Sequence, residues 1–397
     1  MHTEPTPLMS KPFAAAAQGR TPGPRLAWVD NLRTAVILLV VHMHACVTYS
    51  HVGGWFITLP PDPELKVKIP FLFWQGHLQS FFMGLLFFIA GYFAETSLAR
   101  KGTGLFLRER WMRLGLPTLF FMLVIWPVTV WGILGHPKVE SMAQLLQRYR
   151  DYTLGGAFLS GSGPLWFTFA LLLYSLVFAA GRRISDGSAA PRPTPGAGHL
   201  LLFGAGLVSA TFLVRLVFPL ETSFLNFQLA YFAQYLVGFW AGARSARHGW
   251  LASFAESPLA GRAGMIGLAG GPILLFAVLW LGGTPGHKMY PYGGGWRWEA
   301  FGLTFWEQLT GPALGCGMPH LFSRHFGFHN RVTQWLAKHS FGVYLLHTPI
   351  LVALALWGQS WQLTPLAGTL WLTFAGLVAA YAAAAVAYKL PGLRAIL

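Results

Sequence analysis

The chain has few charged residues and almost no cysteine. Asp, Glu, Lys and Arg make up only 10% of its 397 residues, whereas hydrophobic residues make up 54%. Because soluble proteins carry about 25% charged residues, this composition excludes an ordinary soluble domain. Cys46 and Cys316 both lie in apolar runs, which excludes a disulfide framework and a cysteine-rich metal site. We interpret both as small buried hydrophobic residues.

The N-terminal segment lacks the apolar core of a signal peptide and is rich in Pro, Gly and Ala. We therefore expect residues 1–27 to form a disordered cytoplasmic tail. Residues 28–390 form one transmembrane domain in this interpretation, and 391–397 form a short cytoplasmic tail. The long apolar runs favour membrane-spanning helices over a membrane β-barrel.

The apolar runs are each close to the roughly 20 residues that a helix needs to cross a bilayer. The sequence predicts an all-α integral membrane protein with about ten transmembrane helices. The predicted spans are 33–50, 72–94, 114–134, 164–181, 199–219, 223–243, 262–283, 301–322, 339–357 and 366–388.

The positive charges sort by side of the membrane. With the N-terminus inside, 20 of the 28 Lys and Arg residues fall in cytoplasmic connections and 7 in the others, while Arg215 lies inside a span. Cytoplasmic loops of membrane proteins carry such an excess. We therefore expect both termini in the cytoplasm, and we do not assign the basic charge to nucleic-acid binding.

Three larger connections are predicted on the outer side, at 51–71, 135–163 and 284–300, and they contain aromatic residues, Gly and Pro. Residues 182–198 have the composition of a flexible cytoplasmic linker.

The first span and its cytoplasmic end carry Asp30, Arg33, His42 and His44. Ionisable groups inside a membrane are candidates for function because burying them there is costly. On a helix, Arg33 and His44 share one face about 16 Å apart, and Asp30 lies near Arg33. His42 points to nearly the opposite side, so His42 and His44 do not form a two-ligand metal pair on a regular helix. We expect no metal site.

This face suggests a division of roles. Arg33, near the cytoplasmic rim, suits a phosphate-bearing donor, and a neutral His44 suits a general base that deprotonates an alcohol. The simpler alternative is that Arg33 follows the positive-inside rule and His44 makes a packing hydrogen bond. Geometry alone leaves both interpretations open.

Other spans add polar candidates. Arg110 and Arg113 are neighbours on one helical face before the third span; taken alone they fit ordinary cytoplasmic charges, but together with Arg33 they could clamp a polyanion. Gln79 and Ser80 are a candidate acceptor group, while Gly84 and Gly91 allow close helix approach. Further candidates are Tyr344, His347 and Glu307. A buried carboxylate such as Glu307 usually has a cationic or histidine partner.

Four segments resemble the acyltransferase 3 family of multi-pass membrane proteins, and are most similar to its glucan biosynthesis protein C branch. They are DNLRTAVILLVVHMHACVTYS with its Arg-x10-His spacing, HLQSFFMGLLFFIAGYF, RERWMRLGLP with its Arg-x-x-Arg pair, and SFGVYLLHTPI. The resemblance covers roughly residues 28–390. Some family members carry an added soluble hydrolase-like domain, which this chain lacks, and His42 is not part of the family pattern.

The resemblance implies an O-acyltransferase of the bacterial inner membrane. Cytosolic acyl-coenzyme A would donate an acetyl or succinyl group to a hydroxyl of an extracytoplasmic carbohydrate, such as a periplasmic glucan or surface polysaccharide. His44 would be the catalytic base or acyl relay, and Arg33, Arg110 and Arg113 would bind the donor. Asp30, Gln79, Ser80, Glu307, Tyr344 and His347 are supporting candidates. No bound cofactor is expected, because acyl-coenzyme A is a substrate.

Two rivals belong to other classes. A secondary transporter or exporter of a glycan or lipid could use the same intramembrane His, Arg and Glu residues as a pathway, but no paired halves with matching broken helices are visible. A sensor or scaffold that binds anionic lipid at its basic rim would need no polar column inside the bilayer. The sequence names neither the acyl group nor the acceptor. It also leaves open whether the transfer is direct or relayed, and which oligomeric state the protein has, a homo-oligomer included.

Overall fold

The computed structural model describes residues 26–184, 192–283 and 290–394. The expected N-terminal tail therefore lies almost wholly outside the described residues, as do 185–191 of the expected linker, 284–289 of the third outer connection and the last three residues.

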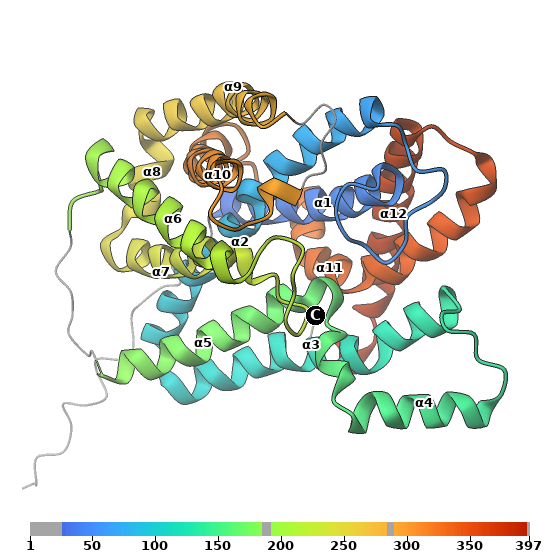
Figure 1. Ribbon diagram of the computed structural model, residues 1–397. Helices are drawn as coiled ribbons and strands as arrows, with labels where there is room; N and C mark the ends of the chain where they lie inside the picture. Colours follow the sequence, from blue (N-terminus) through green and yellow to red (C-terminus); the bar gives the residue numbers. More distant parts are fainter. Residues whose placement is uncertain (1–25, 185–191, 284–289, 395–397) are drawn as a thin grey trace, which may run out of the picture.

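The described residues form α-helices, π-helical segments at Trp111–Gly115, Phe121–Ile125 and Val128–Ile133, and short 3-10 helices, joined by turns and loops, with no β-strand among them (Figure 1). The all-helical prediction is confirmed for this part of the chain. The α-helices are α1 (Ala27–Ser50), α2 (Leu65–Arg110), α3 (Leu116–Phe120), α4 (Met142–Leu154), α5 (Trp166–Ile184), α6 (Ala197–Val217), α7 (Phe232–His248), α8 (Trp250–Glu256), α9 (Pro258–Leu281), α10 (Trp298–His325), α11 (Arg331–Gly358), α12 (Pro365–Ala387) and α13 (Pro391–Arg394).

Seven helical segments of the described chain are long and apolar enough to cross a membrane. One of them, Leu65–Ile133, contains both the second and the third predicted span. The helix is broken within it at Gly102, whose φ of 74° and ψ of 168° are non-helical. Glycine adopts this conformation without the steric cost that a Cβ would bring. The 17-residue α7 and the longer α10 are not among the seven, so the count of ten spans stays a prediction.

Two predictions about elements were wrong: the start of the sixth span, and a loop where the helix α4 lies. The sixth span was predicted to start at 223, but residues 223–231 form turns and α7 begins only at Phe232. The helix α4 lies within a segment that was predicted as a loop, and it stands at the edge of the fold, away from the main bundle (Figure 1). The Ser141 hydroxyl caps α4 by accepting a hydrogen bond from the backbone amide of Gln144, which is a typical N-cap arrangement.

Glycines permit the closest helix contacts. A Cβ at Gly91 of α2 would lie 1.9 Å from the Phe239 carbonyl oxygen of α7, and a Cβ at Gly242 of α7 would lie 1.9 Å from the Phe88 carbonyl oxygen of α2. The backbones of α2 and α7 therefore cross in direct contact, as small residues allow in membrane helices. This contact fits the expectation for Gly91.

Helix α1 packs against α2, α10, α11 and α12, so its side chains face several partners at once. We call the end that carries Arg33 the Arg33 end, and the opposite end the Trp55 end. At the Arg33 end, the Asn31 amide donates to the carbonyls of Phe326 and Phe328 in the α10–α11 turn, at 2.7 and 2.9 Å.

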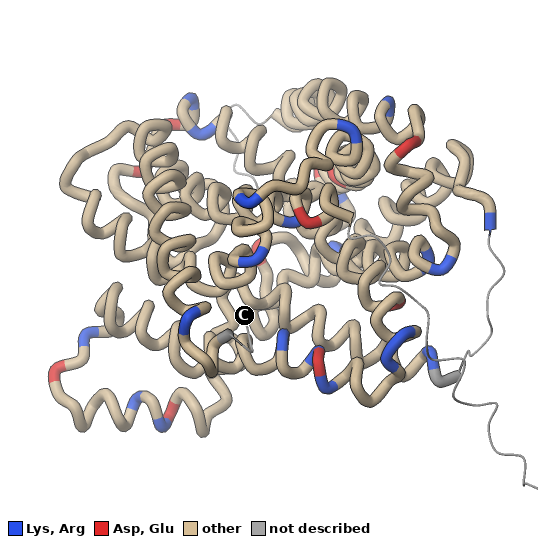
Figure 2. The backbone as a smooth tube through the Cα atoms, turned by 180° about the vertical axis from the view of Figure 1, so that it is seen from behind, with Lys and Arg blue, Asp and Glu red and all other residues tan. Residues whose placement is uncertain are grey.

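Long stretches of helix carry no charged residue (Figure 2).

Candidate active site

Three aromatic rings meet near the last turns of α1. The His44 and Trp55 rings stack with centroids 3.6 Å apart and planes 16° apart. The His347 ring of α11 lies 5.4 Å from His44 and 6.0 Å from Trp55, again nearly parallel. These distances form a triangle with nearly a right angle at His44, so His347 lies beside the stack and not beneath it. We call His44, Trp55 and His347 the ring cluster.

The ring cluster contains polar atoms that no protein group satisfies. His44 Nδ1, Trp55 Nε1 and His347 Nε2 are buried and have no hydrogen-bond partner. His347 Nδ1 lies 2.8 Å from the Tyr344 carbonyl oxygen, which can only accept. The proton of neutral His347 is therefore on Nδ1, and Nε2 holds a lone pair. Buried polar atoms are nearly always bonded, so three such atoms at one place indicate a site for a ligand.

A polar network holds the segment that carries Trp55. The Ser50 hydroxyl donates to Gln75 Oε1 at 2.9 Å and accepts from the Val52 amide at 3.1 Å. Gln75 Nε2 donates to the Val52 carbonyl at 2.9 Å. Gln75 and Ser50 are themselves buried. The network therefore fixes the chain as it leaves α1, three residues before Trp55.

The rest of this loop is tied down by its own contacts. The Leu59 amide donates to the Thr48 carbonyl of α1 at 2.9 Å. The exposed Asp62 carboxylate pairs with Lys68 Nζ at 2.6 Å and lies 3.1 Å from His51 Nδ1. The hydrogen bond from Lys68, and after it the charges of Lys68 and His51, lower the pKa of Asp62 below its usual value. Residues 51–64 thus form a folded loop over this end of α1.

A second loop completes the cover of the ring cluster. The Tyr344 hydroxyl donates to the Pro164 carbonyl, so the turn before α5 rests on α11 one helical turn from His347. A Cβ at Gly163 would lie 2.7 Å from the Phe121 ring and 3.3 Å from Phe56, the neighbour of Trp55 in sequence. The φ of Gly163 is also positive, at 47°. We call residues 51–64 and 161–165 together the roof.

His42 belongs to a different environment. Trp74 Nε1 donates to His42 Nε2 at 2.9 Å, so the ring proton is on Nδ1, which donates to Thr373 Oγ1 of α12 at 2.9 Å. Both nitrogens of His42 therefore have partners away from the ring cluster. This agrees with the helical geometry, which predicts that His42 and His44 point in nearly opposite directions.

The predicted arginines gather at the Arg33 end. Arg33 Nη1 lies 3.8 Å from Asp30 Oδ1, as the spacing predicts. Arg33 of α1 and Arg113, which follows α2, are both near enough for their positive charges to act on the guanidinium of Arg110, the last residue of α2. Arg110 also lies over the Phe106 ring, 5.0 Å from its centroid. Donor binding by these three arginines stays a prediction.

Glu307, Gln79 and Ser80 lie outside the ring cluster. Glu307 Oε2 is 2.5 Å from Nη2 of Arg215, and Arg215 is completely buried and also donates to Thr304 Oγ1 at 3.0 Å. The partner that the sequence could not name is therefore Arg215. Gln79 donates to the Tyr235 hydroxyl at 3.3 Å, and the Ser80 hydroxyl donates to the His77 carbonyl of its own helix at 2.8 Å.

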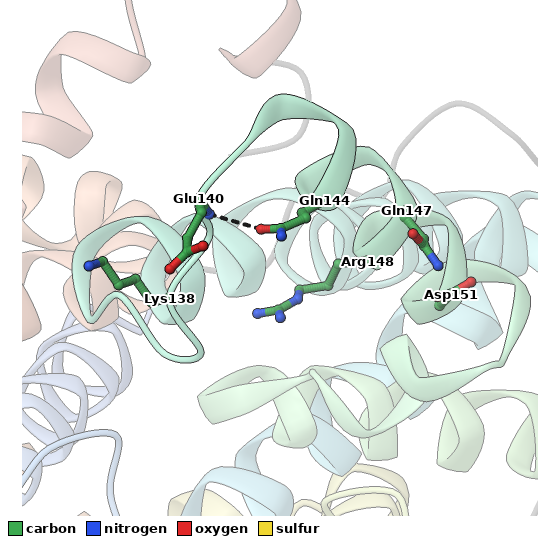
Figure 3. Close-up of a pocket in the computed structure, with 6 residues that line it drawn as sticks. All are labelled: Lys138, Glu140, Gln144, Gln147, Arg148 and Asp151. Carbon is green, nitrogen blue, oxygen red and sulfur yellow. Dashed lines mark hydrogen bonds between the residues drawn. The ribbon is translucent and has the colours of Figure 1, made fainter.

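A separate open pocket of about 470 Å³ lies between α4 and the turn that precedes it (Figure 3). Both basic and acidic side chains line it. The backbone amide of Glu140 donates to Gln144 Oε1 at 3.0 Å. None of the predicted site residues lines this pocket. Its lining residues are Lys138, Glu140, Gln144, Gln147, Arg148 and Asp151.

Sequence reasoning placed His44, Tyr344 and His347 among its candidates but missed Trp55 and the turn at Pro164. Trp55 follows Gly53 and Gly54 in a connection already noted for its aromatic residues. That composition was the only signal for Trp55, because its contact with His44 depends on how the loop folds back.

Comparison with known proteins gives one match. The acyltransferase 3 family model, described as an acyltransferase domain, matches residues 26–389. No curated protein and no solved structure matches the chain significantly. The matched range includes both the ring cluster and the arginines of the Arg33 end.

Proposed function

We propose, from the premise that this chain belongs to the acyltransferase 3 family, that it transfers an acyl group across the bacterial inner membrane. The donor is cytosolic acyl-coenzyme A, and the acceptor is a hydroxyl of an extracytoplasmic carbohydrate. Acetyl and succinyl are the groups we favour. Within the family, the resemblance to the glucan biosynthesis protein C branch favours succinylation of a periplasmic glucan.

One observation carries this proposal. A single helix, α1, presents Arg33 at one end and His44 about 16 Å further along the same face. Arg33 lies in a positive cluster with Arg110 and Arg113, and His44 lies in a group of buried, unpartnered nitrogens. The guanidinium groups suit the phosphates of a coenzyme, and the imidazole suits an acyl transfer to an alcohol.

The donor would then lie along α1. Its phosphates bind at the Arg33 end, which we place at the cytoplasmic side, and its thioester reaches the ring cluster beneath the roof. The acceptor hydroxyl approaches from the Trp55 end, which we place outside. His44 takes the hydroxyl proton as the oxygen attacks the thioester carbonyl carbon. His347 and Tyr344 support His44 from α11.

The first test compares two neighbouring histidines. We expect His44→Ala to abolish acyl modification of the carbohydrate while the protein level in the membrane stays normal. His42→Ala is the matched control, because His42 has partners on both nitrogens outside the ring cluster. We expect it to have the milder effect. Equal modification in wild type and His44→Ala would refute the assignment.

The second test identifies the chemistry. Mass spectrometry of periplasmic glucans and surface polysaccharides from a strain without this protein should show a lost mass increment, which names the acyl group, in one fraction, which names the acceptor. Release of coenzyme A by the purified protein with acyl-coenzyme A and that carbohydrate separates a transferase from a transporter of glycans or lipids, which would release none.

A further inference from the structure

The ring cluster offers an unusual combination of unpartnered groups. The indole nitrogen of Trp55 can only donate a hydrogen bond, and Nε2 of neutral His347 can only accept one. Both atoms are buried without a partner, as is His44 Nδ1. A ligand that satisfies this group must bring an acceptor atom for Trp55 and a proton for the imidazoles.

The two reactants of an acyl transfer bring these features. The thioester supplies a carbonyl oxygen, which accepts hydrogen bonds and becomes negatively charged when the carbonyl carbon is attacked. The alcohol supplies the proton. A donor aimed at that oxygen stabilises the transition state more than the ground state, and such donors commonly contribute the largest single term in acyl transfer.

We propose that the indole N–H of Trp55 donates the hydrogen bond that stabilises the oxyanion of the acyl transfer. This inference rests on the proposed function and adds a catalytic residue to it. The Trp55 ring stacks on His44 with centroids 3.6 Å apart, so the indole that carries this N–H lies against the imidazole that takes the hydroxyl proton. Donor and base therefore act on two oxygens that are bonded to the same carbon of one tetrahedral intermediate.

The acceptor oxygen forms a bond to the carbonyl carbon, its proton moves to His44, and the carbonyl π electrons move to the oxygen facing Trp55. The carbon–oxygen double bond then re-forms and the carbon–sulfur bond breaks. The thiolate of coenzyme A leaves and receives the proton from His44. No redox partner or metal is needed.

The surroundings of Trp55 suit this role. An oxyanion donor works best when it is held in place beforehand in a site without water. The hydrogen bonds among Ser50, Gln75 and Val52 fix the chain just before Trp55. The turn at Gly163 and Pro164 packs beside it through Phe56 and Tyr344. The indole N–H is thus positioned before a substrate binds.

The test removes the N–H while it keeps the ring. Purified protein carries either Trp55→Phe or 3-benzothienylalanine at position 55, which replaces the indole nitrogen by sulfur. Coenzyme A release is measured with acetyl- and succinyl-coenzyme A, with a glucan oligosaccharide or water as acceptor. Trp361→Phe is the matched control, since Trp361 packs on Trp357 and Trp371 at ring distances of 4.9 and 4.8 Å.

We expect both changes at position 55 to lower kcat by about 10²-fold, the usual effect of losing one oxyanion donor. KM for donor and acceptor should stay within about threefold, and Trp361→Phe should behave as wild type. Because the benzothienyl ring has almost the shape of indole, the same loss in that variant excludes a folding defect as the cause.

The oxyanion role of Trp55 and the proposed function fail in different ways. If wild type is active and the benzothienyl variant keeps its full kcat, or changes KM alone, the oxyanion role of Trp55 is wrong while the proposed function stands. If wild type releases no coenzyme A from either donor under any of these conditions, or if His44→Ala is as active as wild type, the proposed function is wrong and the role of Trp55 falls with it.

Discussion

His44 and His347 come from the first and the eleventh α-helix, yet their rings lie nearly parallel with centroids 5.4 Å apart. The His347 ring proton is on Nδ1, at the Tyr344 carbonyl, so Nε2 carries a lone pair. That lone pair has no hydrogen-bond partner. A neutral imidazole in this state can stabilise the positive charge that His44 gains when it accepts a proton.

We therefore predict that His347→Phe lowers kcat for acyl transfer by about 10²-fold, at the lower end of the usual contribution of acid–base catalysis. Phenylalanine keeps the aromatic packing but offers no lone pair. The measurement is coenzyme A release by the purified variant. His42→Phe serves as the control, because both ring nitrogens of His42 have partners outside the ring cluster. Full activity of His347→Phe would show that His347 only packs against His44.

Donor binding should depend on Arg110. We predict that Arg110→Ala raises the donor Kd by about 10-fold or more, because a hydrogen bond to a charged group contributes about 1.5–3 kcal/mol. Isothermal titration with a non-hydrolysable acyl-coenzyme A analogue measures this. Arg108→Ala is the control, since Arg108 is exposed and its charge is not among those that act on Arg110. An unchanged Kd for Arg110→Ala would contradict the donor-site assignment.

The Arg215–Glu307 pair should matter for stability. Removing one member of a buried ion pair leaves the other charge uncompensated, at a cost of about 3–5 kcal/mol. We predict that Arg215→Met lowers the unfolding temperature in detergent, and that Arg215→Met with Glu307→Gln recovers part of the loss. Thermal unfolding followed by tryptophan fluorescence tests this. A double variant less stable than the single one would show that the charge of Glu307 is not the cause.

The attachment of the Trp55 loop should depend on pH. The pKa of Asp62 is lowered by its hydrogen bond from Lys68, so this contact favours the folded loop above the usual pKa of Asp62 and is lost as the pH falls through the lowered value. We predict that proteolysis within residues 51–64 becomes faster below about pH 4. Asp62→Asn should be cleaved at the faster rate already at neutral pH. Equal cleavage of wild type and Asp62→Asn across this range would contradict the role of Asp62.

The sequence predicts the parts of the site that lie within one helix. Helical geometry places Arg33 and His44 on one face and His42 on the other, and the contacts of His42 agree with this. Composition predicts a helical membrane protein, and the positions of Tyr344 and His347 within an apolar run mark them as candidates.

The sequence does not predict which helices meet. Arg215 is 92 residues from Glu307, and no local pattern joins them. Trp55 contacts His44 from a loop whose start is held by a hydrogen bond between Ser50 and Gln75, which are 25 residues apart. The position of α4 was missed because hydropathy windows that find spans ignore short amphipathic helices.

The unpartnered nitrogens of the ring cluster have a consequence for the stability of the protein. A buried polar atom without a hydrogen bond costs about 1–3 kcal/mol, and His44, Trp55 and His347 each have one. Apolar replacements at these three positions would remove that cost, so they should raise thermal stability while they remove activity. Selection for a more robust protein and selection for an active one would then act in opposite directions on the same three residues.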